Sequence, residues 1–121
     1  MNEEITEQII GAAIEVHKAL GPGLLESIYE EALCIEFNLR NISFERQVKV
    51  DVTYKGHQIK GQRLDLLVER SVVVELKCVQ NLPGTALAQV LSYLKATHLR
   101  TALLINFGEE RLVDGIKRIS L

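Results

Sequence analysis

The stretch RLDLLVERSVVVELK, residues 63–77, decides the fold. It contains two short apolar runs, Arg63 to Glu69 and Val72 to Lys77, with the polar pair Arg70-Ser71 between them. Short runs rich in Leu and Val that are bounded by polar residues are typical of buried strands. The stretch therefore predicts two strands joined by a tight hairpin.

Two carboxylates and a lysine interrupt these apolar runs. Successive side chains of a strand alternate between the two faces of the sheet, so Glu75 and Lys77 share one face. If the hairpin is centred on Arg70, Asp65 lies directly opposite Glu75, with Cβ atoms about 4.5 to 5.5 Å apart. A register shift of one residue would place the two carboxylates on opposite faces.

Facing carboxylates of this kind have a specific chemistry. They repel each other unless a proton or a cation lies between them. A hard divalent ion such as Mg²⁺, with Mn²⁺ as a substitute, accepts one or two carboxylates together with waters and phosphate oxygens. Lys77 could then orient a water or offset charge on a reacting phosphate. The pattern suits hydrolysis of a phosphodiester, although a solvated ion pair worth about 0 to 1 kcal/mol is the alternative interpretation.

Two helices are expected before this stretch. Apolar residues at three- and four-residue spacing predict an amphipathic helix over residues 3–20, which Gly21-Pro22-Gly23 ends. A second helix is expected from Leu24 to about Leu39. Its buried side is predicted to consist of Leu25, Ile28, Ala32, Leu33 and Ile35.

The remaining elements follow from changes of periodicity. Alternating residues from Val48 to Tyr54 predict a strand, and Lys55-Gly56 a turn, so that three strands form a meander. A helix capped by Thr85 is expected to end near Ala96. An apolar strand is expected from Thr101 to Phe107. Residues 109–121 are expected to add a short turn and an edge strand. The order α-α-β-β-β-α-β predicts an α/β (α+β) fold, a mixed sheet with helices on both faces and a parallel crossover into the strand at Thr101.

Size and composition exclude several classes of protein. The 121 residues suit a single domain over residues 1–121, and 47% hydrophobic and 25% charged residues are typical of globular proteins rather than disordered or fibrous ones. Cys34 and Cys78 are too few for a disulfide framework or a zinc knuckle, so reduced thiols and a cytoplasmic location are expected. No apolar run approaches the roughly 20 residues that cross a bilayer, and no membrane partner is expected.

The net charge of −2 hides an asymmetry. Residues 1–45 hold 2 basic and 9 acidic residues, whereas residues 46–121 hold 12 and 7. The segment around the predicted turn is basic, and extended basic hairpins can follow phosphates, although lysines on an edge strand also deter aggregation. The candidate nucleic-acid contacts are Arg46, Lys49, Lys55, Lys60 and Arg63.

Several short motifs together resemble a known family. Gly23-Leu-Leu-Glu26-Ser-Ile-Tyr29 resembles the G-x-x-E-x-x-Y signature of the GxxExxY family, and the elements around Asp65, Glu75-Leu-Lys77 and Gln89-x-x-x-Tyr93 follow in that family's order. The resemblance extends from about residue 5 to Phe107. That family is similar to a compact branch of the PD-(D/E)xK nuclease superfamily, whose restriction-endonuclease-like α/β/α core has the same order of elements. The proline that often precedes the first acidic residue is replaced by Leu64.

The resemblance implies a set of roles. Asp65 and Glu75 would be metal ligands, the backbone carbonyl of Leu76 a third ligand, and Lys77 the catalytic lysine. Glu26 would help to hold the metal. The supporting residues would be Tyr29, Gln89 and Tyr93, the last two resembling the Q-x-x-x-Y element of RecB-like nucleases.

Three functional hypotheses follow. The first is metal-dependent phosphodiester hydrolysis of nucleic acid, with DNA as the expected substrate and Mg²⁺ as the cofactor. The second is a non-catalytic module that keeps the nuclease fold within an assembly. The third is a dimer like the Holliday-junction resolvases, which would make a homodimer the functional unit.

Overall fold

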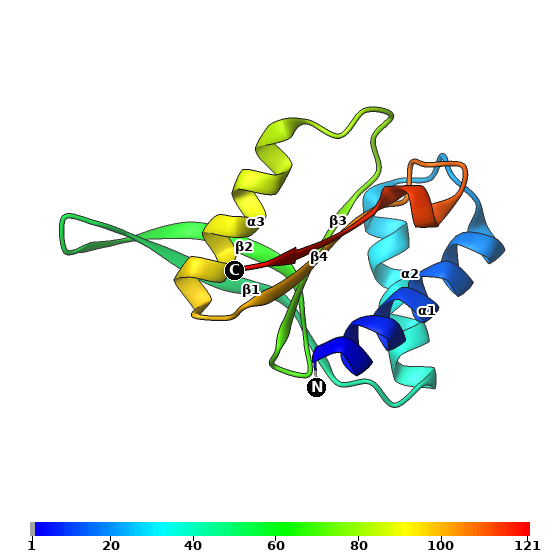
Figure 1. Ribbon diagram of the computed structural model, residues 1–121, viewed down its shortest axis with the longest axis horizontal. Helices are drawn as coiled ribbons and strands as arrows, with labels where there is room; N and C mark the ends of the chain where they lie inside the picture. The colour runs from blue at the N-terminus through cyan, green and yellow to red at the C-terminus, as the bar shows by residue number, and fades with distance from the viewer. Residues whose placement is uncertain (1) are drawn as a thin grey trace.

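The computed structural model describes residues 2–121, which form helices packed on a five-stranded mixed sheet (Figure 1). The helical elements are α1 (Asn2–Leu20), α2 (Glu26–Leu39), α3 (Gly84–Thr97) and the 3₁₀ helix η1 (Leu112–Gly115). The strands are β1 (Phe44–Tyr54), β2 (His57–Val68), β3 (Val72–Lys77), β4 (Thr101–Asn106) and β5 (Ile116–Ser120). The expected α/β (α+β) class and the order of elements are confirmed.

The strands lie in the order β1-β2-β3-β4-β5. β3 and β4 are parallel, and the other neighbours are antiparallel. Every residue of β4 is buried, as expected for a strand with neighbours on both edges and helices on both faces. The meander, the parallel crossover and the edge strand near the C-terminal end are all as predicted.

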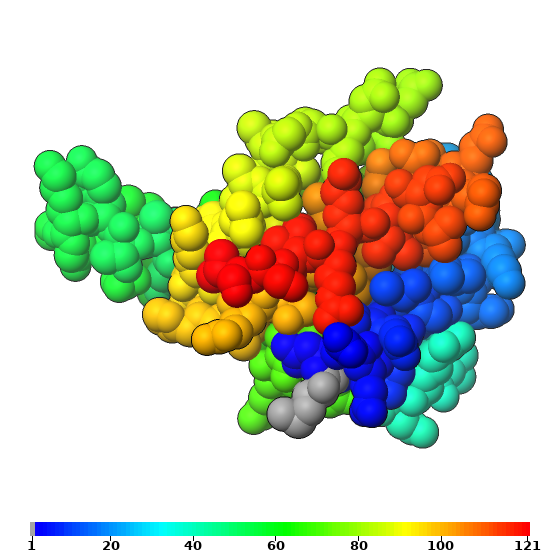
Figure 2. All heavy atoms as spheres, in the orientation of Figure 1, coloured from blue at the N-terminus to red at the C-terminus, as the bar shows by residue number. Residues whose placement is uncertain are grey.

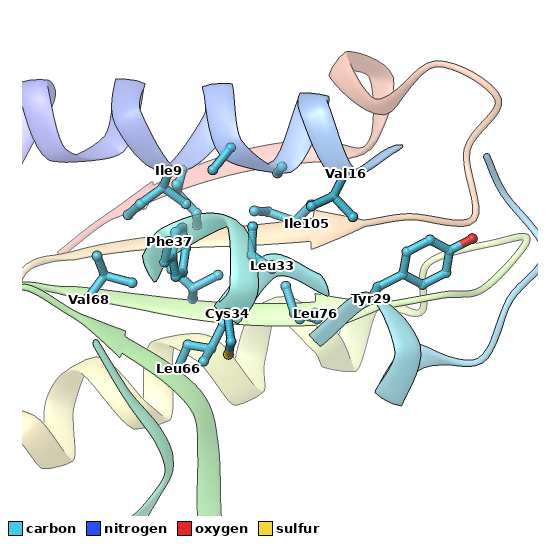
Figure 3. Close-up of a cluster of buried hydrophobic side chains, with 14 of the residues drawn as sticks. Ile9, Val16, Tyr29, Leu33, Cys34, Phe37, Leu66, Val68, Leu76 and Ile105 are labelled. Atoms are coloured by element: carbon cyan, nitrogen blue, oxygen red, sulfur yellow. The ribbon is translucent and has the colours of Figure 1, made fainter. Parts of the chain in front are cut away.

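The apolar core on one face of the sheet is formed by α1 and α2 (Figure 3). The side of α2 that packs on the sheet consists of Tyr29, Leu33, Cys34 and Phe37, which are buried. The prediction that Leu25, Ile28 and Ile35 supply the buried side was therefore wrong. They are exposed because the larger aromatic stripe of the same helix fills the space above the sheet.

The opposite face of the sheet is covered by α3. Val90 and Leu94 of this helix pack against Val73, Ala102 and Leu104. The helix begins two residues earlier than expected, because Pro83 is its N-cap rather than Thr85. The sheet is thus enclosed between the α1/α2 layer and α3. The charged side chains of β3, Glu75 and Lys77, therefore lie where little water reaches them.

The hairpin of β1 and β2 extends beyond this body as an arm (Figures 1 and 2). Residues 51–61 are exposed on both faces of the hairpin. Lys55 and Gly56 have φ values of 49° and 81°, the left-handed conformation that a tight two-residue hairpin turn needs. Both strands are longer than predicted, since β1 begins at Phe44 and β2 at His57.

Candidate functional site

The hairpin register ends one residue before the two expected carboxylates, and hydrogen bonds bring them together. Leu66 pairs with Val74 and Val68 with Val72, which is the register centred on Arg70. Beyond Leu66 the backbone pairing is replaced by two side-chain contacts. The amide of Asp65 donates to Glu75 Oε1 at 2.7 Å, and the amide of Leu76 donates to Asp65 Oδ2 at 2.9 Å. Each carboxylate therefore bridges to the other residue's strand.

Glu75 is buried, with only 3% of its surface exposed. Burial, followed by the negative charge of Asp65, raises the pKa of Glu75 to about 8 from its ordinary value of 4.5. The hydrogen bond from the amide of Asp65 acts in the opposite direction but does not cancel these effects. At neutral pH without a cation, the site therefore favours a protonated Glu75.

Lys77 and α3 lie on the same side as Glu75. Val73, two residues before Glu75, packs against α3, whereas Val74 and Leu76 face α1 and α2. Lys77 Nζ is 3.5 Å from Gln89 Oε1, and the Tyr93 hydroxyl donates to the carbonyl of Arg63 at 3.0 Å. Burial, then the charges of Glu75 and Asp65, raises the pKa of Tyr93 to about 12, which keeps its phenol protonated as a donor.

Glu26 lies at the first turn of α2, close enough for its charge to interact with that of Asp65. Partial burial, followed by the charge of Asp65, raises the pKa of Glu26, while the charge of Lys77 lowers it. The N-terminal end of α2 thus contributes a third acidic group to the same region, from a separate element of the fold.

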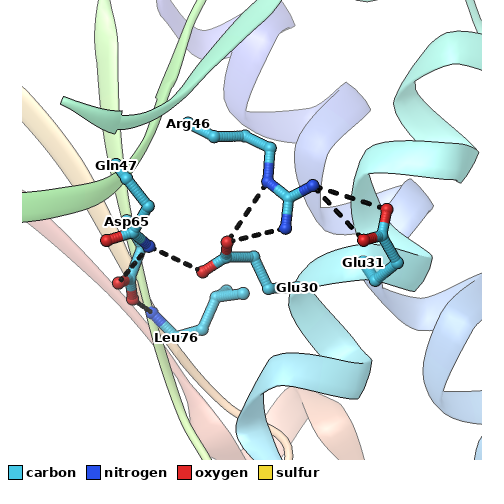
Figure 4. A network of polar contacts seen from close by, with 6 residues as sticks. All are labelled: Glu30, Glu31, Arg46, Gln47, Asp65 and Leu76. Atoms are coloured by element: carbon cyan, nitrogen blue, oxygen red, sulfur yellow. Dashed lines mark hydrogen bonds and ion pairs between the residues drawn. The ribbon is translucent and has the colours of Figure 1, made fainter.

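A polar network that the motifs did not reveal joins α2 to Asp65 (Figure 4). Gln47 Nε2 donates to Glu30 Oε1 at 3.0 Å and to Asp65 Oδ1 at 3.4 Å. Arg46 forms ion pairs with Glu30 at 3.0 Å and Glu31 at 3.4 Å. These partners are more than fourteen residues apart in sequence, so no local spacing could have identified them. Among the candidate nucleic-acid contacts, Arg46 is therefore engaged within the protein.

Tyr29 anchors the segment that leads into α2. Its buried hydroxyl donates to the carbonyl of Gly21 and accepts a hydrogen bond from the amide of Leu24 at 3.2 Å. Its ring stacks on Phe107, with centroids 4.6 Å apart. The tyrosine thus fixes the loop between α1 and α2 and, through it, the position of Glu26.

The variant Tyr29→Phe should lower the free energy of unfolding by about 1 kcal/mol, because the carbonyl of Gly21 and the amide of Leu24 would lose their partner. Urea denaturation measures the change. Tyr54→Phe is the matched control, since Tyr54 is exposed on the hairpin arm. Equal stability of the two variants would contradict the anchoring role.

Asn106 holds the segment that follows Lys77. Its side chain accepts from the amide of Val79 at 3.1 Å and donates to the carbonyl of Val79 at 3.0 Å. A Cβ on the nearby Gly108 would clash with the Val79 carbonyl oxygen, so only glycine permits this close approach. This two-point contact limits the movement of the chain beside Lys77, and it was not apparent from sequence.

A groove of about 930 Å³ lies between the hairpin arm and α3. Lys49 and Lys60 line it from the arm and Lys95 from the helix, together with Asp51 and His98. Lys60 is 3.9 Å from Asp51, whereas no ion pair engages Lys49 or Lys95 within residues 2–121. The arm was expected to be basic, but Lys95 could be added only once the fold had placed α3 beside it.

The donor set of the site suits one hard cation. Within residues 2–121, no three acidic, histidine or cysteine side chains converge as a ready-made metal cluster. Asp65 and Glu75 nevertheless present two facing carboxylates, and Mg²⁺ is commonly held by one or two carboxylates while it keeps several waters. Burial, followed by the charge of Asp65, raises the pKa of Glu75, and a bound cation would offset both effects.

Comparison with known proteins gives one match. The family model described as the PD-(D/E)XK nuclease superfamily matches residues 3–119. No curated protein matches the chain, and no solved structure matches it. Among the helices of residues 2–121, none combines the length and apolar character needed to cross a membrane.

Proposed function

Because the chain belongs to the PD-(D/E)XK nuclease superfamily, we propose that it is a metal-dependent nuclease that hydrolyses phosphodiester bonds, with DNA as its substrate. The observation that carries the proposal is the facing pair of Asp65 and Glu75, with Lys77 on the same face as Glu75. A buried carboxylate whose pKa is raised to about 8 is costly in a purely structural role.

Asp65 and Glu75 are the proposed cation ligands. A divalent ion held there would polarise a phosphate oxygen and acidify a water molecule. Leu76 is a further ligand candidate through its carbonyl. Its amide points to Asp65, and the N–H and C=O of one strand residue leave the strand at the same edge. Glu26 would contribute from α2, directly or through water.

Lys77 is the proposed catalytic lysine. Its ammonium group is 3.5 Å from the side-chain oxygen of Gln89, and its charge lowers the pKa of Glu75. There it could hold a water for attack or offset the negative charge that develops on the phosphate. In this scheme Gln89 and Tyr93 position groups on the α3 side, and Tyr29 fixes the entry to α2.

Cleavage assays test the proposal. Labelled single-stranded, duplex and branched DNA, and RNA, would be incubated with Mg²⁺, Mn²⁺ or a chelator. Cleavage that needs the metal and falls by at least about 100-fold in Asp65→Asn would support it. The asparagine can still accept from the amide of Leu76, so the variant removes the charge but not the hydrogen bond. Absence of cleavage on every substrate with both metals would contradict the proposal.

The groove beside α3 is the proposed path for the nucleic acid. Lys49 pairs across the hairpin with Arg63, whose carbonyl is bound by Tyr93, so the groove begins next to the site. Its lysines could contact successive phosphates. Lys55 and Lys60 farther along the arm extend the same basic surface, while Arg46 would first have to leave Glu30 and Glu31.

Removal of groove charge should weaken binding and reduce its salt dependence. In an Asp65→Asn background that does not cleave, Lys49→Ala with Lys95→Ala should lower DNA affinity about 10-fold or more. The slope of log K against log salt should fall by roughly 1.4 to 1.8, corresponding to two lost phosphate contacts. Fluorescence anisotropy measures both quantities. Lys18→Ala on α1 is the matched control, and a slope unchanged by the double substitution would exclude the groove.

A non-catalytic module is the second candidate function. It is favoured by the two main-chain amides that already occupy one oxygen of each carboxylate, and by the lack of a converged third ligand among the described residues. Calorimetric titration with Mn²⁺ separates the candidates. A nuclease should bind the ion and lose this binding in Asp65→Asn, whereas a module need not bind it.

Finer assignments accompany the proposal. We place the chain in the GxxExxY branch, because Gly23, Glu26 and Tyr29 belong to one local unit at the start of α2. We take residues 1–121 as one nuclease-like domain, since the family match spans 3–119. A cytoplasmic location is supported by Cys34 and Cys78, which are both free.

A further inference from the structure

An apolar stripe runs along the outer side of α2. Leu25, Ile28, Ala32, Ile35 and Leu39 follow one another at alternating spacings of three and four residues, which aligns them on one face of a helix. Leu25 and Leu39 are each 73% exposed, Ile35 is 55% exposed and Ile28 is 45% exposed. We call these five residues the α2 stripe.

Apart from Ala32, which also packs partly against the core, the α2 stripe is separate from the residues that bind α2 to its own protein. Tyr29, Leu33 and Phe37 are fully buried on the inner side. Glu26 and Glu30 also belong to the inner side, where they interact with Asp65 and Gln47. Four large exposed side chains in a continuous line are unusual on a monomer surface and are typical of an interaction site.

The residue types of the stripe form a palindrome along α2: leucine, isoleucine, alanine, isoleucine, leucine. From Ala32, isoleucines lie four residues before and three after, and leucines lie seven before and seven after. A two-fold axis through Ala32 would therefore place leucine against leucine, isoleucine against isoleucine and alanine against alanine. An isologous interface requires this self-complementarity, and a small residue at its centre lets two helices approach closely.

We propose that the α2 stripe is the interface of a homodimer, in which α2 of one copy packs antiparallel on α2 of a second copy. Leu25 then contacts Leu39 of the partner subunit, and Ile28 contacts Ile35 of the partner subunit. The proposal does not depend on nuclease activity.

The charges beside the stripe are compatible with a second copy. Glu36 is paired with Arg40 at 2.7 Å, and Glu31 with Arg46 at 3.4 Å. Arg46 also pairs with Glu30, so two arginines offset most of the acidic charge beside the stripe. The like charge that two copies bring together is therefore reduced, although one carboxylate per copy stays without its own arginine.

The helix is held in place before association. Its inner side is fixed by the core, so dimerisation would not have to order it and would cost mainly overall translational and rotational freedom. The 14 residues of α2 span about 21 Å, which gives a small interface. We therefore expect a dimer with a dissociation constant on the order of 10 μM rather than an obligate one.

Sedimentation velocity from about 1 to 500 μM tests the interface. The wild-type protein should shift from monomer to dimer across this range. Ile28→Lys and Ile35→Glu should each weaken association by at least about 100-fold, because two-fold symmetry introduces each unpaired charge twice. Both positions are exposed, so the variants should fold, which circular dichroism would verify.

Mixing the two variants tests the antiparallel arrangement. An equimolar mixture of Ile28→Lys and Ile35→Glu should regain dimers. The introduced lysine of one copy would face the introduced glutamate of the other, while the remaining wild-type isoleucines stay in contact. In a parallel pair the substituted positions would not meet, and the mixture would remain monomeric.

The matched control is Val113→Glu, which places a charge on another exposed apolar residue outside the stripe and should leave dimerisation unchanged. A wild-type protein that is monomeric at 500 μM would overturn the proposal and assign the stripe to a different partner. A dimer insensitive to both stripe variants, or a mixture that fails to associate, would overturn it as well.

Discussion

Replacement of Glu75 by glutamine is expected to stabilise the metal-free protein at pH 8.5 by about 2 to 4 kcal/mol and to abolish its binding of divalent cations. The glutamine oxygen can still accept from the amide of Asp65, so the variant keeps the hydrogen bond and removes the buried charge. The corresponding rise in melting temperature is roughly 10 °C for a chain of this size.

The effect should depend on pH in a defined direction. Burial raises the pKa of Glu75 from 4.5 to about 8 in the folded protein. The folded state therefore holds this proton more tightly than the unfolded chain. The contribution of Glu75 to the unfolding free energy falls as pH rises from about 4.5 to about 8 and is constant outside that range.

Chemical denaturation at pH 5 and pH 8.5 measures this dependence. The difference between wild type and Glu75→Gln should be small at pH 5 and large at pH 8.5. Glu7→Gln on the exposed side of α1 is the control and should show no such trend. If Glu75→Gln were destabilising at pH 8.5, the carboxylate would be a structural acceptor rather than a charge retained for function.

Substitution of Lys77 by methionine is expected to lower the rate of cleavage by about 100- to 10,000-fold. Methionine fills the half-buried position without an ammonium group, so the fold should be retained. The positive charge of Lys77 lowers the pKa of both Glu75 and Glu26, so its removal leaves the acidic groups harder to ionise. The midpoint of the pH profile of metal binding should therefore move to higher pH.

Single-turnover cleavage and Mn²⁺ titration separate the two effects. The rate at saturating substrate should fall far more than DNA affinity. Lys77→Arg should recover the pH profile of metal binding but only part of the rate, because a guanidinium is larger and remains protonated. Lys18→Met is the control for loss of an exposed lysine. Wild-type turnover by Lys77→Met would remove Lys77 from the chemistry.

The sequence was most informative where side-chain chemistry and strand periodicity agree. The hairpin around Arg70 could be predicted because the apolar runs on both sides have similar length and a polar turn separates them. Glu69 and Arg70 adopt the left-handed turn conformation, with φ values of 51° and 54°, although neither is glycine. The facing pair of Asp65 and Glu75 followed from this register.

The orientation of α2 could not be read in the same way. The helix has two apolar stripes, one containing Tyr29, Leu33 and Phe37 and the other the α2 stripe. Spacing alone shows that both are helical and not which of them faces the sheet. The choice depends on packing against residues distant in sequence, among them Phe107. For the same reason the ion pairs of Arg46 and the contacts of Asn106 with Val79 required the fold.

The position of β4 in the sheet has a consequence for the order of folding. The carboxylates lie on β2 and β3, whose hairpin is local in sequence and can form early. β4 is synthesised later and pairs with β3 only after α3 has crossed the sheet. We therefore expect Glu75 to stay hydrated while the hairpin forms, and the free-energy penalty of its burial to fall on the long-range step that brings α3 and β4 onto β3.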